Sequence, residues 1–201
     1  VAFGSTKPLN RPGDIFFLNG AFPPTAEEIQ AHTPTPVIFG ETSVAEPYTA
    51  PSLFNISAMS YGALSGPAIS ALSQGAYQSG IWLNTGEGGL SPFHQQAPCD
   101  LVFQIGTAKY GVRDEQGRLD AAKLSELAAI PEIKMFEIKL SQGAKPGKGG
   151  ILPGEKVTEV IASTRGITAG QDSISPNRHP EVTSVESLLD LIATVRDVSK
   201  K

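Results

Sequence analysis

The stretch Lys134-Met-Phe-Glu-Ile-Lys-Leu140, followed by Ser141-Gln-Gly-Ala-Lys-Pro-Gly-Lys-Gly-Gly150, decides the fold. The first part is apolar enough to form a strand, and the second is a polar loop rich in glycine. A helical pattern comes next, with Val157, Val160 and Ile161 expected to point inward. The order strand, loop, helix places this loop where parallel α/β proteins bind their ligands.

The same order occurs upstream. We expect strands at residues 53–58, 81–83 and 101–105, each ending in a polar loop that contains glycine. One helix is expected to begin near Ser65 and to stop at Gly80, and another to begin at an Asp120 cap. Strands that alternate with helices predict parallel βαβ units, as in a (β/α)8 TIM barrel or a doubly wound sheet.

A last helix is expected from the capping box Thr183-Ser-Val-Glu186, with an inward stripe of Val185, Leu188, Leu189, Ile192 and Val195. The sequence thus predicts about four βα units over residues 51–201, which would be the N-terminal half of a barrel. Residues 1–50 are rich in proline and predict an extended arm with a short helix near Thr25–Ala31.

Composition narrows the possible functions. The chain has 201 residues and a formal net charge of −4, without a basic cluster, so nucleic acid is not an expected partner. No apolar run reaches the roughly 18 residues of a membrane span. Cys99 is the only cysteine, which excludes a disulfide framework, a zinc site or an iron–sulfur cluster made by this chain alone. The single thiol favours a reducing compartment, so we expect a cytoplasmic protein. A start at Val1 without methionine suggests that residues, including a membrane anchor, could lie upstream.

Three side chains are candidates for chemistry, each with an ordinary alternative. Glu87, between glycines, could orient toward a substrate or ammonia, or it could be an exposed loop acid. Lys139, near the end of a strand, could stabilise negative charge on a flavin or enolate, or it could face outward. Arg165 ends a helix, where it could clamp a carboxylate or merely offset the negative helix terminus.

Gln142, Lys145 and Lys148 belong to the glycine-rich loop. A Walker phosphate loop needs a final Gly-Lys-Ser/Thr, whereas Gly149 follows Lys148 here, so that motif is rejected. The loop could still bind a carboxylate or a phosphate, or it could be a solvated surface loop. His94 and His179 have no metal-ligand partner at a recognised spacing, and we expect surface or hydrogen-bonding roles for them.

Three motifs together resemble the FMN-binding synthase domain of glutamate synthases. They are Ile56-Ser-Ala-Met-Ser-Tyr-Gly-Ala-Leu-Ser65, Asn84-Thr-Gly-Glu-Gly-Gly89 and Lys139-Leu-Ser-Gln-Gly-Ala-Lys-Pro-Gly-Lys-Gly-Gly150. Ser173-Ile-Ser-Pro176 with His179 is similar to the same family. The resemblance covers residues 50–195 and is closest to the shorter bacterial FMN-binding glutamate-synthase-like proteins.

The resemblance implies a (β/α)8 barrel that holds FMN at the carboxyl ends of its strands and forms L-glutamate from 2-oxoglutarate and ammonia. It implies contacts with the flavin for Met59, Ser60, Asn84, Gln104 and Lys139. It implies a 2-oxoglutarate site for Gln142, Lys145 and Arg165, with Glu87 and Lys145 as the catalytic pair.

The sequence also departs from the family. The three cysteines that hold the family's iron–sulfur cluster are not in this chain, so such a cluster would need ligands outside it. Strands that bind the flavin phosphate are absent too, so we expect a fragment that is inactive alone and that associates with the rest of the barrel, a partner chain or another copy of itself. Two alternatives stay open: an FMN oxidoreductase acting on another small acid, and a non-catalytic ligand-binding scaffold.

Overall fold

The computed structural model describes residues 21–32, 36–142 and 147–201. The chain divides into two compact units, residues 1–35 and 36–201. In the first unit the structure describes one helix, α1 (Ala26–Ala31), which confirms the helix predicted there. Its capping box explains why it begins where it does: the Thr25 hydroxyl accepts the amide N–H of Glu28, and the Glu28 carboxylate accepts that of Thr25.

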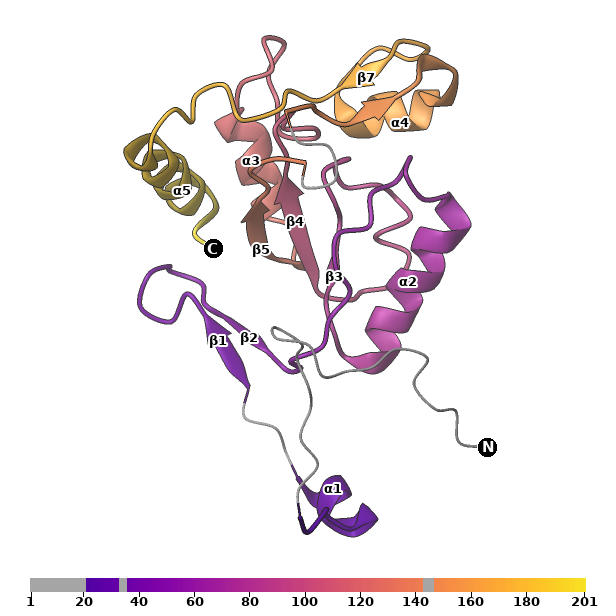
Figure 1. The fold of residues 1–201 in the computed structure, drawn as a ribbon, viewed down its shortest axis with the longest axis vertical. Coiled ribbons are helices and arrows are strands. Elements are labelled where there is room, and N and C mark those ends of the chain that lie inside the picture. Colours follow the sequence, from indigo (N-terminus) through magenta and orange to yellow (C-terminus); the bar gives the residue numbers. More distant parts are fainter. Residues whose placement is uncertain (1–20, 33–35, 143–146) are drawn as a thin grey trace. The chain divides into compact units, whose positions relative to one another are not determined.

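The second unit is built on a parallel sheet in the order β3-β4-β5, formed by β3 (Leu83–Asn84), β4 (Leu101–Ile105) and β5 (Ile133–Ile138) (Figure 1). The three predicted strands are confirmed, with ends shifted by up to two residues. Parallel strands with helices between them give a mixed α/β fold.

The strand predicted at residues 53–58 is wrong. Only Ile56 pairs, through one parallel bridge to Leu83. The Ser52 hydroxyl bonds both to the carbonyl and to the amide of Phe54, and such a local turn competes with extended pairing. The segment nevertheless runs beside β3, because the Ile56 amide donates to Trp82 O at 3.0 Å.

The two faces of the sheet differ in chemistry. One face carries Leu101, Phe103 and Ile105, which are buried in the main hydrophobic core together with residues of α2 (Gly66–Ser79), α3 (Ala121–Ala128) and α5 (Val185–Ser199). Side chains alternate along a strand, so Gln104 and its register partner Glu137 lie on the opposite face. Because Phe136 and Ile138 also pack against the core, Lys139 follows the phase of Glu137.

The predicted helix ends are mostly confirmed. Gly80 stops α2 in the left-handed conformation at φ 61°, and the Asp120 carboxylate caps α3 by accepting two amide N–H groups. Helix α4 (Glu159–Arg165) begins at Thr158, after a short 3-10 turn, and stops at Gly166. Val157 therefore precedes the helix. It is buried, as expected, as is Ile161, but Val160 is 45% exposed, which corrects its predicted inward position.

The predictions for helix α5 were wrong in the residues of the capping box and in part of the buried face. Its capping box joins Ser184 to Ser187, not Thr183 to Glu186, because the Ser187 side chain accepts the Ser184 amide N–H. The buried pair is Leu191 and Val195, whereas Val185 and Leu189 are 69% and 57% exposed. The apolar residues of this helix are spread too widely for the pattern alone to select the buried face.

Two antiparallel pairs of strands were not predicted. One pairs β1 (Val37–Phe39) with β2 (Tyr48–Ala50), within the stretch interpreted as an extended arm. The other pairs β6 (Ile151–Leu152) with β7 (Ser173–Ile174), on either side of α4. Leu152 packs with a small second core of Val157, Ile161 and Ala162, so the β6–β7 pair and α4 form one packed substructure.

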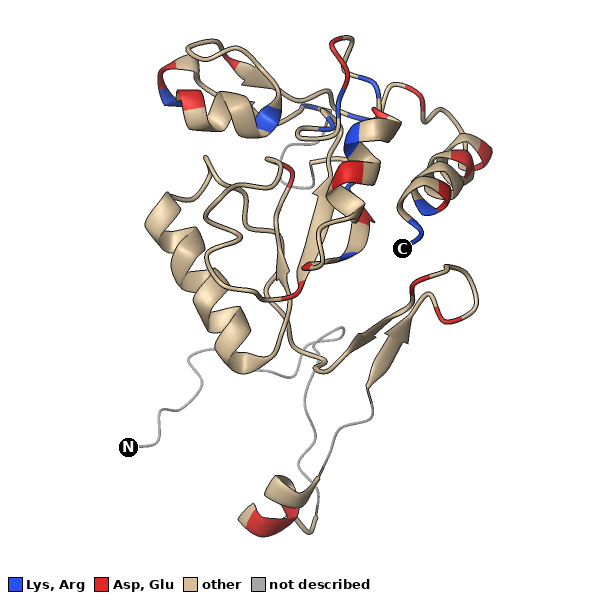
Figure 2. Ribbon diagram, turned by 180° about the vertical axis from the view of Figure 1, so that it is seen from behind, with Lys and Arg blue, Asp and Glu red and all other residues tan. Residues whose placement is uncertain are grey.

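Helices α3, α4 and α5 carry charged side chains of both signs, whereas α2 carries none (Figure 2). Helices α4 and α5 both carry an acid in the first turn and an arginine in the last, which suits the helix dipole. Among the described residues, no helix is both long and apolar enough to cross a membrane.

Candidate functional site

The loop after β3 presents Glu87. The Asn84 side chain closes this loop by accepting the Gly86 amide N–H at 2.9 Å. Gly86 has φ 67°, and a Cβ there would lie 2.6 Å from the Ser60 amide nitrogen. Glycine is therefore needed, because the loop passes directly against the backbone of the Met59–Ser60 segment. A Cβ on Gly106 would likewise lie 2.6 Å from Glu87 Cβ, so the exit of β4 is shaped to accept this glutamate.

Glu87, Lys139 and Gln142 form one hydrogen-bonded cluster. The Gln142 amide donates to both Glu87 oxygens, at 2.7 and 2.8 Å. Lys139 Nζ lies 3.3 Å from Glu87 Oε1 and donates to Gln142 Oε1 at 3.1 Å. Lys139 thus points toward the loop that carries Glu87 and does not face outward. The side chains stay 28% exposed at Lys139 and 20% at Glu87, so a ligand can reach them.

Arg165 points into the protein from the last turn of α4. Its Nη1 donates to Ser173 Oγ at 2.9 Å, and its Nη2 donates to Tyr61 O at 3.3 Å. The guanidinium carbon lies 5.0 Å from the centre of the Tyr110 ring, within reach of a cation–π contact. Burial lowers the pKa of Arg165, while nearby Tyr110 and Glu87 oppose that effect. Arg165 is only 7% exposed, so it does not merely offset the helix terminus in solvent.

One nitrogen of Arg165 is left over. Among the described residues, its buried Nε–H finds no acceptor. A buried charged donor without a partner is costly, and such groups are often completed by a ligand or a water molecule.

Glu87, Gln142 and Arg165 line the same cavity, which has a volume of about 210 Å³. Ser60 contributes to it from the segment beside β3, so loops from several strands and from α4 meet there. The remaining lining residues are Ala63, Tyr110, Gly150, Ile151, Leu152, Ser173 and Ser175. A carboxylate, an amide and a buried cation around one small cavity can bind a small polar acid.

The polar face of the sheet continues the site. Asn84 Nδ2 donates to Glu137 Oε1 at 3.1 Å, and Gln104 Nε2 donates to the same oxygen. Glu137 was missed by sequence reasoning, although its spacing of two residues from Lys139 was a usable signal. Met59 packs its side chain against the main core, and its amide N–H donates to Asn84 O at 3.1 Å.

Lys145 lies outside the described residues. Lys148 is exposed. The two histidines are both buried: His94 is 0% and His179 is 1% exposed, so the surface role is wrong and the hydrogen-bonding role is confirmed. Each imidazole bonds the carbonyl of a loop residue, Met59 for His94 and Lys139 for His179.

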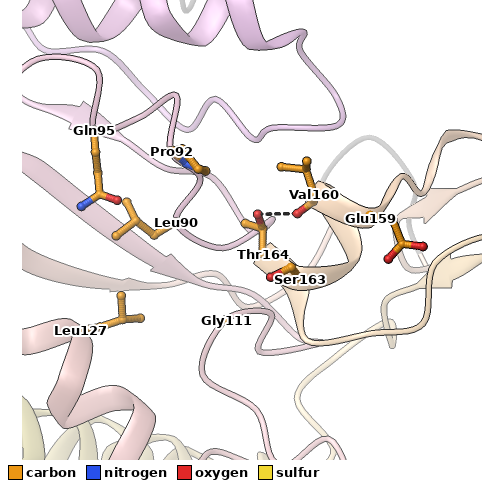
Figure 3. Close-up of a pocket in the computed structure, with 9 residues that line it drawn as sticks. All are labelled: Leu90, Pro92, Gln95, Gly111, Leu127, Glu159, Val160, Ser163 and Thr164. Carbon is orange, nitrogen blue, oxygen red and sulfur yellow. Dashed lines mark hydrogen bonds between the residues drawn. The ribbon is translucent and has the colours of Figure 1, made fainter.

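A larger cavity of about 520 Å³ lies elsewhere, lined by Leu90, Pro92, Gln95, Gly111, Leu127, Glu159, Val160, Ser163 and Thr164. Figure 3 shows its two longest polar side chains, Gln95 and Glu159, at opposite ends of an open groove. Thr164 is already bonded to the backbone of Val160. The polar groups do not converge, so this groove is a weaker candidate. Over the described ranges, no three His, Cys, Asp or Glu side chains are placed to hold a metal ion.

Several curated proteins are similar in sequence to this chain. The glutamate synthase large subunit-like protein YerD of Bacillus subtilis is 40% identical over 237 aligned residues, covering 100% of this chain and 45% of the relative. An archaeal-type glutamate synthase (NADPH) of Thermotoga maritima is 40% identical over 143 residues, covering 71% of this chain and 26% of the relative. The archaeal glutamate synthase (NADPH) of Methanocaldococcus jannaschii is 38% identical over 145 residues, with 72% and 26% covered.

The chain spans less than half the length of these curated relatives. Residues 22–201 match the family described as the conserved region in glutamate synthase. This match includes Glu87, Lys139, Gln142 and Arg165 and nearly all of the described structure. The chain belongs to the glutamate synthase family.

Proposed function

We propose that this chain forms part of the FMN and 2-oxoglutarate site of a glutamate-synthase-type oxidoreductase, which makes L-glutamate from 2-oxoglutarate and ammonia. In this proposal the parallel strands belong to a (β/α)8 barrel, with the arm of residues 1–50 preceding it. Family membership supports the reaction class, and the loop edge of the sheet supports the location of the site.

One observation carries the proposal: Glu87 and the buried Arg165 line a single small cavity together with Gln142. A dicarboxylate needs a cation for each carboxylate, and Arg165 supplies one of them at the wall of the cavity. We assign the second carboxylate to Lys145. The cavity of about 210 Å³ suits a small acid better than a large ligand.

The polar face of the sheet fits FMN as one wall of its site. Asn84, Gln104 and Lys139 offer amide and ammonium donors, which suit the oxygen- and nitrogen-rich edge of an isoalloxazine ring. Ser60 and the backbone of Met59 adjoin these donors, since the Met59 amide bonds to Asn84 O. When bound, the flavin would supply the hydride for the reduction. A positive Lys139 near the ring would stabilise negative charge there.

In the proposed reaction, each of these residues has a separate role toward the substrate. Ammonia adds to the keto carbon of 2-oxoglutarate, and loss of water gives 2-iminoglutarate. Glu87 would take the proton from the incoming ammonium ion, because its carboxylate is placed at the cavity and accepts from Gln142. Arg165 and Lys145 would hold the two carboxylates while one hydride and one proton convert the imine into L-glutamate.

The partners follow from this assignment. We propose 2-oxoglutarate as the small-molecule substrate and the remainder of the barrel, in this protein or in a partner chain, as the other wall of the site. An iron–sulfur cluster would use ligands outside these 201 residues. The single buried cysteine is compatible with the cytoplasm.

The first test is the cofactor itself. The protein expressed from its complete gene should purify with flavin, or gain it on reconstitution with FMN, as measured by visible absorbance. Lys139→Met should weaken flavin binding, because it removes the ammonium group, whereas Lys148→Met, at an exposed position, should not. A colourless protein that takes up no FMN would contradict the flavin assignment and favour the scaffold alternative.

A further inference from the structure

His179 lies behind Lys139 and contacts its backbone. The imidazole is 1% exposed, and its Nε2 lies 2.9 Å from Lys139 O. A carbonyl oxygen can only accept a hydrogen bond, so the proton of this bond is on Nε2. Lys139 is the first residue after β5, and its carbonyl has left the ladder of the sheet.

Both backbone groups of Lys139 are thereby fixed. Its amide N–H continues the sheet by donating to Ile105 O at 3.0 Å, and its carbonyl accepts from His179. With the backbone held on both sides, the side chain leaves the strand in a set direction, toward Glu87 Oε1 and Gln142 Oε1. A side chain held in this way loses less conformational entropy when a ligand arrives.

The surroundings of His179 keep its other nitrogen unprotonated. Nδ1 is buried, lies 3.9 Å from Glu181 Oε1 and has no hydrogen-bond partner among the described residues. Glu181 is paired instead with Lys109 Nζ, at 2.9 Å. Burial, together with the positive charge of Lys109, lowers the pKa of His179. Of the two neutral forms of the ring, only the one with its proton on Nε2 can donate to Lys139 O.

Burying the charged Lys109 beside His179 costs free energy, which argues that His179 does more than fill space in the core. Lys109 is 1% exposed and adopts φ 52°, a left-handed conformation that is unusual for a residue other than glycine. The Lys109–Glu181 ion pair joins the loop of Lys109 to the segment of His179. A second contact joins the same two segments, because Thr107 Oγ1 donates to Pro176 O at 2.7 Å. By comparison, buried His94 has both ring nitrogens bonded, to Ser91 and to Met59 O.

We propose that His179 is a positioning residue, which directs Lys139 toward Glu87 and Gln142 through its bond to the Lys139 carbonyl. The function of Lys139 in catalysis rests on the proposed function above, whereas the positioning itself does not. The experiments therefore measure the protonation of His179 and the reactivity of Lys139, and they need neither flavin nor substrate.

The wild-type protein gives the first test. In ¹⁵N NMR spectra that correlate ring nitrogens with ring protons, His179 should show the neutral tautomer with its proton on Nε2. A neutral ring with its proton on Nδ1 would overturn the proposal, because it has no proton to donate to Lys139 O. This measurement needs no variant and so does not depend on how well a variant folds.

The second test measures how fast Lys139 reacts with an amine-acylating reagent, by mass spectrometry of its peptide. In His179→Leu, Lys139 should lose its fixed direction toward Glu87, and its acylation should become about threefold faster, as expected when a partly exposed ion pair is lost. His179→Gln retains an amide donor and should restore a rate close to that of the wild type.

Tyr48→Phe is the matched control for loss of stability. It removes a hydrogen bond of 2.7 Å to Asp100, which lies before the start of β4, at the other end of the sheet. This variant should leave Lys139 acylation unchanged. If His179→Leu and Tyr48→Phe gave the same Lys139 rate as the wild type, the positioning role would be refuted. A protein that fails to bind FMN but passes both tests would contradict only the proposed function.

Discussion

Arg165 satisfies two of its three guanidinium nitrogens within the protein and leaves Nε without an acceptor among the described residues. A lysine could not bond Ser173 and Tyr61 as the two terminal nitrogens of Arg165 do, because its ammonium is a single point on a flexible stem. At this position the shape of the side chain matters as much as its charge.

We therefore predict that Arg165→Lys raises the KM for 2-oxoglutarate by about tenfold or more, the effect of losing one charge-assisted hydrogen bond. The measurement is initial-rate kinetics on the complete enzyme. Arg118→Lys is the control, because this side chain is 76% exposed and bonds within its own turn, and it should change KM by less than about twofold. Equal effects of the two substitutions would contradict the assignment of Arg165 to the substrate.

The sequence was sufficient to predict which residues belong to the candidate site, but not which contacts they make. It named Glu87, Gln142 and Arg165, which line one cavity. It missed the acceptor Glu137 and the burial of His179. Both depend on which face of a strand or loop is covered, and packing between distant segments decides that.

The loops that follow the strands are the elements that build the site, and glycines set how closely they approach. Gly106, at the exit of β4, would place a Cβ 2.6 Å from Glu87 Cβ, a contact that cannot be relieved by rotating a flexible chain end. The loop after β3 therefore fits against the loop after β4 only when position 106 carries no side chain.

Gly106→Ala is predicted to displace Glu87 and to lower kcat/KM by about tenfold or more, since small misplacements of catalytic groups cost large factors in rate. Gly75→Ala is the matched control: it adds the same methyl group in α2, where no atom lies within 4 Å. Removing a glycine from a helix interior should even stabilise the protein by about 0.5–1 kcal/mol. Thermal unfolding measured beside activity separates the two effects, and an unimpaired Gly106→Ala enzyme would show that Glu87 tolerates movement.

Element prediction succeeded where a local signal is strong. The stop of α2 at Gly80 and the cap of α3 at Asp120 follow from the residue types themselves. The prediction of a strand at residues 53–58 was wrong because Ser52 forms a local turn. The pairing of β6 with β7 could not be predicted, because each of these strands has only two residues. Short pairings of this kind depend on tertiary contacts, not on a sequence period.

At the scale of the whole molecule, one apolar face of the sheet is buried against three helices, and the other face carries polar side chains that lead to the candidate site. The alternation of strands and helices was enough to predict this parallel α/β arrangement. The buried face of α5 was not predictable in the same way, because apolar residues surround much of that helix.

The two buried histidines should make the stability of the molecule depend on pH. Burial lowers the pKa of both His94 and His179 from the ordinary value of 6.5. The unfolded chain then binds more protons than the folded protein as the pH falls through that value, so the free energy of unfolding decreases on acidification. The slope should reach up to about 1.4 kcal/mol per pH unit for each imidazole.

Urea denaturation over a pH series from about 7 to about 5 measures this slope. His179→Gln should flatten it, since one of the two titrating groups is removed while the hydrogen-bond donor remains. A free energy of unfolding that stays constant across this range would show that the imidazoles titrate normally in the folded protein.

The most direct test of the proposed function uses the complete enzyme with its flavin reduced under anaerobic conditions. Mixing it with 2-oxoglutarate and ammonium together should reoxidise the flavin and yield L-glutamate, and neither compound alone should do so. Glu87→Gln should slow this reaction strongly, because it removes the proton acceptor from the cavity. A reduced flavin that stays reduced in the presence of both compounds would contradict the account.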